Sequence, residues 1–315
     1  MDKVRVVIAL GGNALQADPM DTTAEAQLIT AKETAKPLVD LIEDGHEVII
    51  AHGNGPQVGQ IIATYEGATG MAAMPFPECG AMSQGYIGYH LQQALREEMK
   101  KRGIEKSVAT LLTQVVVDKN DPGFNNPTKP VGSFFSAAEA QKLEAEMGYI
   151  MKEDAGRGWR RVVASPEPLD VVEAPMVKTL VDAGHVVITV GGGGVPVIDK
   201  GNGALEGVSA VIDKDFASEK MAEILDAHEL IILTAVEKVA INFNTSNQID
   251  LDTLTIAEAK RYIAEGHFAP GSMLPKIQAA VRFVESKPGR KALITSLEKA
   301  KDGIEGKTGT IITAE

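Results

Sequence analysis

The chain has 315 residues, 44% of them hydrophobic, and a net charge of −12 at neutral pH. These values predict a soluble globular protein of one large domain or two lobes, and the acidic balance argues against general binding of nucleic acid or anionic membranes. The single cysteine, Cys79, excludes an intrachain disulfide and a cysteine-based zinc cluster, and no apolar run is long enough to cross a membrane. We therefore expect a cytoplasmic protein in which the positive charge for any anionic ligand is local.

Three apolar runs that end in glycine predict parallel strands. The runs are VRVVIALGGN, which starts close to the N-terminus without a signal-peptide pattern, GHEVIIAHGNG and GHVVITVGGGG. Their polar ends comprise Gly11, Gly12, Asn13, Gly53, Asn54, Gly192, Gly193 and Gly194. Strands so rich in valine and isoleucine, separated by helices, indicate a mainly parallel sheet covered on both faces.

Two helical stretches precede the second and third strands. They read AQLITAKETAKPLVDLIEDG and APMVKTLVDAG. Each ends at a glycine suited to a left-handed helix cap, Gly45 or Gly184. Thr22 and Glu25 have the spacing of a capping box at the start of the first helix.

The glycine loops fall where α/β proteins bind their ligands, at the carboxyl ends of parallel strands. Glycine lets backbone N–H groups approach an anion closely, and a helix that starts after the loop adds its dipole. In the second loop Gly53, Gly55 and Gly59 are spaced GxGxxxG, which differs from the GxGxxG dinucleotide fingerprint. One such loop is equally well explained as a tight turn, but three matched loops favour a shared anion pocket.

Three lysines lie in unusual settings. Lys129 stands between two prolines in NNPTKPVG, on an expected loop. Lys214, flanked by Asp213 and Asp215, and Lys276 in PGSMLPK each stand at an expected helix start. A lysine there opposes the helix dipole, and a bound phosphate would reverse that penalty.

Other motifs are weaker. The GKT at residues 306–308 lacks the first glycine of a phosphate-binding loop, since that position is Lys301, so we expect a turn before a last strand. Cys79 is more readily explained as a small packed residue than as a nucleophile. The six histidines lack metal-ligand spacing, so no protein-held metal site is predicted.

Eight segments carry a resemblance that extends over almost the whole chain. They are ALGGNAL, HGNGPQVG, CGAMSQGYIGY, PTKPVG, KEDAGRGWRRVVASP, VGGGGVPV, VIDKD and PGSMLPK. In these segments the chain resembles the carbamate kinases of the amino acid kinase family. The resemblance implies an α/β fold, an open three-layer αβα sandwich with a mainly parallel central sheet and a small protruding subdomain, and a homodimer.

The resemblance also implies that two lobes of the chain bind the two substrates. An N-terminal lobe, residues 1–208, would bind the phosphoryl acceptor and carry an inserted lid at about residues 119–165, while residues 209–315 would bind the nucleotide. Other kinases of the family resemble one another in a lysine on the first strand, where this chain has Ala9 and Leu10. In carbamate kinases the lysine of the protruding subdomain supplies that charge, and Lys129 matches it.

Site roles follow residue by residue from the same resemblance. Gly11, Gly12 and Asn13 would cradle the transferring phosphoryl group, and the acceptor pocket would comprise Gly53, Asn54, Gly192, Gly193, Gly194 and Lys129. Lys214 and Lys276 would contact nucleotide phosphates, and Asp215 would orient them. The adenine would lie against Thr234, Ala235, Val236 and Met273, although a core strand with a hairpin explains these residues equally well.

The implied reaction is reversible phosphoryl transfer between ATP and carbamate, giving ADP and carbamoyl phosphate, with ATP synthesis in arginine catabolism as the expected use. Carbamate is already an anion, so no general base is required, and Mg²⁺ would be held mainly by ATP oxygens and water. Two alternatives stay open at this point. One is a kinase of the same fold that acts on a larger carboxylate or phosphonate, and the other is a non-enzymatic metabolite sensor.

Overall fold

In the computed structural model, residues 4–18, 20–68, 70, 72–154 and 156–315 are described, Asn13 by its backbone alone. Within them lies an eight-stranded sheet in the order β15-β17-β16-β12-β1-β2-β9-β3, in which only the β16–β17 pair is antiparallel. The expected mainly parallel sheet is therefore confirmed. Its strands are β1 Arg5–Leu10, β2 Glu47–His52, β3 Val108–Thr110, β9 Val186–Ile188, β12 Glu229–Thr234, β15 Thr253–Thr255, β16 Lys291–Ser296 and β17 Thr310–Thr313.

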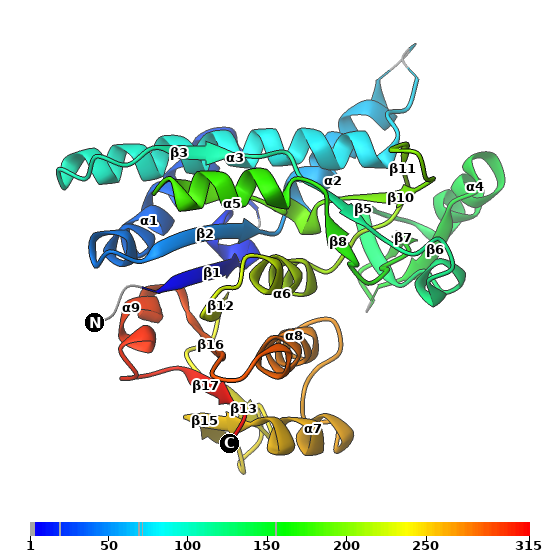
Figure 1. Ribbon diagram of the computed structural model, residues 1–315. Helices are drawn as coiled ribbons and strands as arrows, with labels where there is room; N and C mark the ends of the chain where they lie inside the picture. The colour runs from blue at the N-terminus through cyan, green and yellow to red at the C-terminus, as the bar shows by residue number, and fades with distance from the viewer. Residues whose placement is uncertain (1–3, 19, 69, 71, 155) are drawn as a thin grey trace.

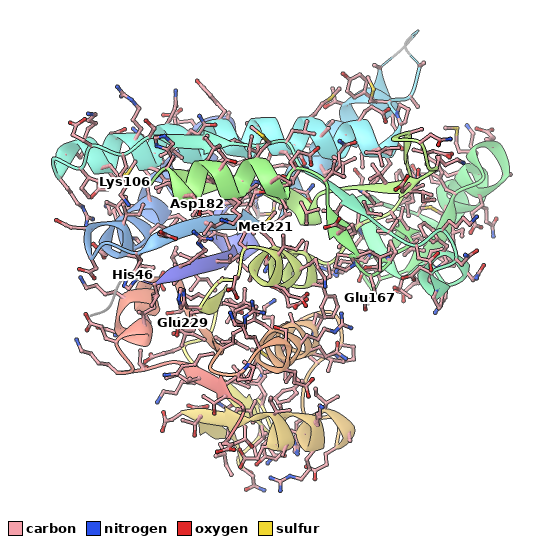
Figure 2. All side chains as sticks on the ribbon, in the orientation of Figure 1. His46, Lys106, Glu167, Asp182, Met221 and Glu229 are labelled. Atoms are coloured by element: carbon pink, nitrogen blue, oxygen red, sulfur yellow. The ribbon has the colours of Figure 1, made fainter. Side chains whose placement is uncertain are left out.

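Helices cover both faces of this sheet and make it the middle of three layers (Figure 1). Val6, Ile8 and Leu10 of β1 pack in a core with α1 (Ala24–Glu43), α3 (Phe76–Lys101) and α9 (Ala300–Ile304). Val7 and Ala9 pack in the opposite core with α5 (Ala174–Asp182), α6 (Lys214–Ile224), α7 (Ile256–Ala264) and α8 (Met273–Ser286). Met221 of α6, labelled in Figure 2, is fully buried in that second core. Because side chains of a strand alternate between faces, a strand buried on both must be apolar at every position.

Smaller sheets lie beside the main one. A four-stranded sheet has the order β11-β10-β4-β8, with bounds Leu205–Gly207, Val195–Asp199, Gln114–Val116 and Asp170–Val171. A hairpin pairs β13 (Val239–Ile241) with β14 (Ile249–Leu251). A three-stranded sheet, β5 (Lys129–Phe135), β7 (Trp159–Val163) and β6 (Ile150–Glu153), carries α4 (Ala137–Met147) and extends beyond the end of the main sheet (Figure 1). We call these strands with α4 the protruding unit.

Polar contacts hold the base of the protruding unit. Asp121 accepts hydrogen bonds from the backbone N–H of Gly123 at 2.7 Å and of Glu167 at 3.0 Å, and so ties the outgoing and returning chain together. The carboxylate of Glu167 (Figure 2) pairs with Arg282 of α8 at 2.5 Å. Lys129 is the first residue of β5, so the prediction that it lies on a loop was wrong. It belongs to the strand because it pairs with Val163 of β7.

Helix ends follow the predicted chemistry with one correction. Gly45 and Gly184 have φ values of 92° and 86°, so both left-handed caps are confirmed. The cap of α1 is Thr23, whose hydroxyl accepts from the N–H of Ala26, and the predicted capping box of Thr22 with Glu25 was wrong because the helix begins one residue later. The turn before the last strand is present, with Gly306 at a φ of 73°. In the described part of the chain, no helix is long and apolar enough to cross a membrane.

Candidate active site

The three glycine loops meet at one edge of the main sheet. They follow β1, β2 and β9, which are neighbours in the sheet order and parallel to one another. Residues Gly12–Ala14 form a short 3₁₀ turn, Asn54 directly precedes α2 (Gly55–Gly67) without a side-chain cap bond, and Gly191–Gly193 form a second 3₁₀ turn. A backbone hydrogen bond of 3.2 Å from Gly53 to the carbonyl of Leu10 joins the first two loops.

Two glycines of the third loop are required by close contacts. Gly192 has a φ of 67°, and a Cβ there would lie 2.2 Å from Nδ2 of Asn54. Gly193 has a φ of 90°, and its Cβ would lie 2.1 Å from the carbonyl oxygen of Ile212. A side chain at either position would push the third loop away from the second loop or from the segment that enters α6.

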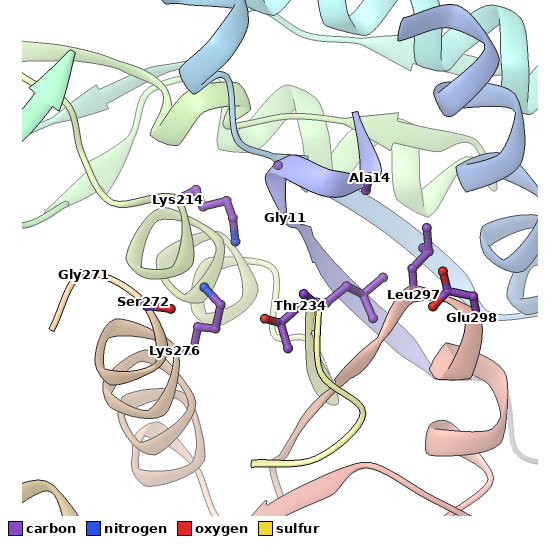
Figure 3. A pocket seen from close by; sticks show the side chains of 12 residues that line it. Gly11, Ala14, Lys214, Thr234, Gly271, Ser272, Lys276, Leu297 and Glu298 are labelled. Atoms are coloured by element: carbon purple, nitrogen blue, oxygen red, sulfur yellow. The ribbon is translucent and has the colours of Figure 1, made fainter. Parts of the chain in front are cut away.

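Lys214, Lys276 and Asp215 form a buried ionic cluster. Lys214 is the first residue of α6 and Lys276 lies in the first turn of α8, and Figure 3 shows their side chains pointing toward one another. Asp215 accepts from Nζ of Lys214 at 2.5 Å and from Nζ of Lys276 at 2.9 Å, and it is only 2% exposed. Burial alone would raise the pKa of Asp215, but the two lysine charges outweigh it and hold that pKa below its ordinary value. The cluster therefore keeps a net positive charge, which suits an anion.

Lys129 reaches the same place from the protruding unit. Its Nζ lies 2.6 Å from Oδ2 of Asp213, while Oδ1 of Asp213 caps α6 by accepting from the N–H of Asp215 at 2.9 Å. The two aspartates that flank Lys214 in sequence thus contact all three lysines that the sequence singled out. The chain brings these lysines together although they are far apart in sequence.

Two adjoining cavities of about 400 Å³ each meet at this cluster. We call the one lined by Gly53, Asn54, Lys129, Arg160 and Gly192 the acceptor cavity. We call the other, lined by Gly11, Thr234, Ala235, Leu297 and Glu298 (Figure 3), the phosphate cavity. Both are lined by Gly12, Lys214, Gly271, Ser272 and Lys276, so a group between them faces two lysines and a glycine loop.

A third cavity of about 530 Å³ continues from the phosphate cavity at Thr234 and Ala235, and we call it the apolar cavity. Val236 and Met273 also line it, so all four residues expected around adenine border one space. The aromatic residues that line this cavity, Phe243, His267 and Phe268, were not predicted from the sequence. Arg160 was not predicted as a site residue either, although it lies in the quoted segment KEDAGRGWRRVVASP.

The second loop rests on buried polar side chains that sequence analysis did not identify. His52 is 1% exposed, and its Nδ1 lies 2.8 Å from the carbonyl of Gly53. Burial lowers the pKa of His52 to about 4, so its imidazole is neutral near pH 7. Ser83 of α3 accepts a hydrogen bond of 2.8 Å from Nδ2 of Asn54. Neither residue type marks a site by itself, since His52 is the last residue of β2 and Ser83 lies within the long helix α3.

The carboxylates near the cluster do not fit a protein-held Mg²⁺ ion. Both oxygens of Asp215 are bonded to lysines, and Asp213 is shared between Lys129 and the helix cap. Glu298 lines the phosphate cavity on the side away from Lys214 and Lys276 (Figure 3). Among the described residues, no group of three or more histidine, cysteine or acidic side chains is arranged to hold a metal.

Comparison with known proteins gives a consistent assignment. Residues 4–296 match the model of the amino acid kinase family. Carbamate kinase of Clostridium perfringens (strain 13 / Type A) is 59% identical over 98% of this chain and 99% of its own, and carbamate kinase-like protein YqeA of Escherichia coli (strain K12) is 61% identical over 98% of each. The structure of carbamate kinase from Giardia lamblia bound to AMP-PNP is 41% identical, with a TM-score of 0.93 over 99% of this chain and 98% of that one. The chain belongs to the amino acid kinase family and lies within it among the carbamate kinases.

Proposed function

We propose that this chain is a carbamate kinase, a phosphotransferase with a carboxyl group as acceptor that interconverts ATP plus carbamate with ADP plus carbamoyl phosphate. The observation that carries the proposal is the convergence of Lys129, Lys214 and Lys276 on Asp213 and Asp215 at the junction of two cavities. The acceptor-side lysine comes from the protruding unit, and the first strand has none.

The phosphoryl group would pass from one cavity to the other. A carbamate oxygen forms a bond to the γ-phosphorus while the bond from that phosphorus to the bridging oxygen breaks, and ADP leaves with the electron pair. No proton moves, because carbamate attacks as an anion. The charge that builds up on the equatorial oxygens would be stabilised by Lys214, Lys276 and the N–H groups at Gly11, Gly12 and Asn13.

We assign the acceptor cavity to carbamate. Lys129 and the backbone of the loops at Gly53, Asn54 and Gly192 to Gly194 would hold its carboxylate side. Arg160 supports this assignment as a further cation, since it lines the same cavity and is held by the carbonyl of Gly132 at 3.0 Å. Cations that are already fixed at this point stabilise the charge of the transition state, whereas water molecules would first have to reorient.

We assign the apolar cavity to adenine, between Thr234, Ala235, Val236 and Met273. The nucleotide phosphates would then run toward Lys214 and Lys276. Mg²⁺ would arrive with the nucleotide, bound by its phosphate oxygens and by water, which agrees with the lysine-bonded carboxylates of the site. When bound, the ion supplies charge neutralisation between the phosphates.

Further parts of the proposal rest on the family resemblance. We propose a cytoplasmic homodimer that works in arginine catabolism, with an acceptor lobe of residues 1–208, a lid of about residues 119–165 and a nucleotide lobe of residues 209–315. The contact of Lys129 with Asp213 would then join the lid to the nucleotide lobe, and that of Glu167 with Arg282 would join the acceptor lobe to the nucleotide lobe. Light scattering of the purified protein tests the dimer.

The test of the activity is ATP formation from carbamoyl phosphate, ADP and Mg²⁺, measured by luciferase luminescence. We expect turnover that depends on all three. The reverse direction is compared with carbamate, N-acetylglutamate, aspartate and UMP as acceptors. A preference for a larger acceptor would assign the chain to another kinase of the fold, and no turnover with any of them would leave a metabolite sensor.

A further inference from the structure

A short hydrogen-bond chain lies under the acceptor cavity. Asn54 at the start of α2 donates from Nδ2 to Oγ of Ser83 at 2.8 Å, and Oγ of Ser83 lies 2.6 Å from the carbonyl oxygen of Gly80. Ser83 is fully buried in α3, whereas Asn54 lines the acceptor cavity. The chain therefore connects the buried interior to a side chain that a ligand can touch.

The chemistry of Gly80 fixes the direction of every bond in this chain. A carbonyl oxygen only accepts, so the proton of the Ser83 hydroxyl must lie between Oγ and Gly80. Ser83 then has only lone pairs left for Asn54, and the amide group that faces it must be NH₂. Turning the Asn54 amide over would place two oxygens against each other with no proton between them.

The opposite end of the same amide is consequently an acceptor. Oδ1 of Asn54 has no hydrogen-bond partner among the described residues, and it lies on the far side of Cγ from the atom that Ser83 holds. Gly192 packs against this amide, since a Cβ at Gly192 would come within 2.8 Å of Oδ1. The glycine therefore makes room for the amide of Asn54, and this residue also lines the acceptor cavity, where a small ligand group can reach it.

We propose that Asn54, oriented by Ser83, recognises the amino group of the acceptor. This inference rests on the proposed function and names what the site selects: a carboxylate or acyl phosphate that carries NH₂. Carbamoyl phosphate has two N–H donors where acetyl phosphate has a methyl group of similar size. An oriented Oδ1 accepts from the first, whereas the second leaves it without a partner. Asn54 is a specificity residue in this account, and Ser83 is a positioning residue.

The test compares carbamoyl phosphate with acetyl phosphate as phosphoryl donors to ADP and Mg²⁺, with kcat/KM measured for each. We expect wild-type protein to prefer carbamoyl phosphate by about 10-fold or more, the value of one buried hydrogen bond. Asn54→Ala should lower kcat/KM for carbamoyl phosphate by a similar factor and leave that for acetyl phosphate nearly unchanged. Ser83→Ala should also lower kcat/KM for carbamoyl phosphate, but by a smaller factor, because the Asn54 amide is then free to turn over.

Ser286→Ala is the matched control. Ser286 of α8 also donates to a carbonyl three residues earlier, that of Phe283 at 2.6 Å, and it also accepts from a side chain, Arg290. Loss of its hydroxyl should leave the ratio of the two kcat/KM values at the wild-type level. A purely structural effect of Ser83→Ala would lower both kcat/KM values together and keep their ratio.

Each outcome decides the inference. An unchanged ratio in Asn54→Ala and Ser83→Ala, or equal use of both donors by wild-type protein, would overturn it while the carbamate kinase activity stands. A wild-type protein that makes no ATP from carbamoyl phosphate would overturn the proposed function and the inference with it. A ratio that falls in both variants and not in Ser286→Ala would establish it.

Discussion

Asp215→Asn tests whether the charge of Asp215 positions the two lysines for catalysis or whether this residue only stabilises the start of α6. The substitution keeps the size of the side chain, but it removes the negative charge and replaces one of the two acceptor oxygens with an NH₂ donor, so only one lysine can still be accepted. The side chain of Asp215 is 3% exposed, and those of Lys214 and Lys276 are 15% and 14% exposed, so water replaces little of the lost interaction. Removing one partner from a buried ion pair costs about 3–5 kcal/mol of folding stability.

The effect on catalysis follows from the same geometry. Without the charge at 2.5 Å and 2.9 Å, the two ammonium groups repel each other and leave the positions that face the phosphate cavity. Loss of one preorganised electrostatic element costs about 10²–10³ in kcat. Urea unfolding and luminescent ATP formation measure the two effects on one preparation.

Asp182→Asn is the matched control for this experiment. Asp182 (Figure 2) also accepts from two cations, Arg5 at 2.7 Å and Lys178 at 2.5 Å, but its side chain is 45% exposed. We expect little change in stability and none in kcat, because exposed pairs are screened by water. Wild-type kcat in Asp215→Asn would refute the reasoning and leave Asp215 as an ordinary acidic residue of a first helical turn.

The remaining predictions concern single groups of the site. Lys129→Ala should depress kcat with carbamoyl phosphate while ADP affinity by calorimetry changes little; a parallel loss of both would place this lysine on the nucleotide side. Gly192 has a φ of 67°, and a Cβ there would lie 2.2 Å from the amide of Asn54. Gly192→Ala should therefore raise KM for carbamoyl phosphate and destabilise the fold by about 1 kcal/mol or more. Unchanged kinetics and an unchanged urea midpoint would contradict this prediction. Burial, reinforced by repulsion from Lys276 and opposed by Asp215, lowers the pKa of Lys214. As the pH rises, kcat/KM should therefore begin to fall before the ordinary lysine pKa of 10.5 is reached. A profile of kcat/KM that stays flat up to that pH would exclude Lys214 as the charged group.

The lowered pKa of Asp215 also makes folding stability depend on pH. Its folded-state pKa lies below the unfolded value, so the native state is stabilised above about pH 4, and this contribution is lost as the pH falls through the folded-state pKa. Asp215→Asn should therefore flatten the acid side of the curve of unfolding free energy against pH. An unchanged slope would mean that other carboxylates carry the acid dependence.

The sequence was informative where function depends on local patterns. Apolar runs and glycine ends predicted parallel strands with loops at one edge, because strand direction alone brings carboxyl ends together. The tripeptide Asp213-Lys214-Asp215 predicted a charged helix start, since the cap and the first turn are read from neighbouring residues. The left-handed glycines at positions 45 and 184 follow from the same local logic.

Contacts made by docking of distant segments could not be read in this way. Lys129 and Asp213 are 84 positions apart, and their ion pair depends on how the protruding unit packs against the start of α6. Phe243 and Phe268 border the apolar cavity from separate segments, and Ser83 reaches Asn54 from inside α3. In each case the residue type is ordinary in its own element, and only the tertiary arrangement gives it a neighbour in the site.

The packing of β1 in this chain gives a physical reason why the proposed acceptor-side cation, Lys129, comes from the protruding unit. Ala9 and Leu10 of β1 are fully buried in opposite cores, so a lysine at either position would place a charge among apolar side chains. Lys129 avoids that cost because it enters from the protruding unit, with its side chain 32% exposed and paired with Asp213. A phosphoryl group between the cavities would compete with Asp213 for this lysine. Since Asp213 also caps the helix that begins with Lys214, the proposed acceptor-side and nucleotide-side lysines are linked through one carboxylate.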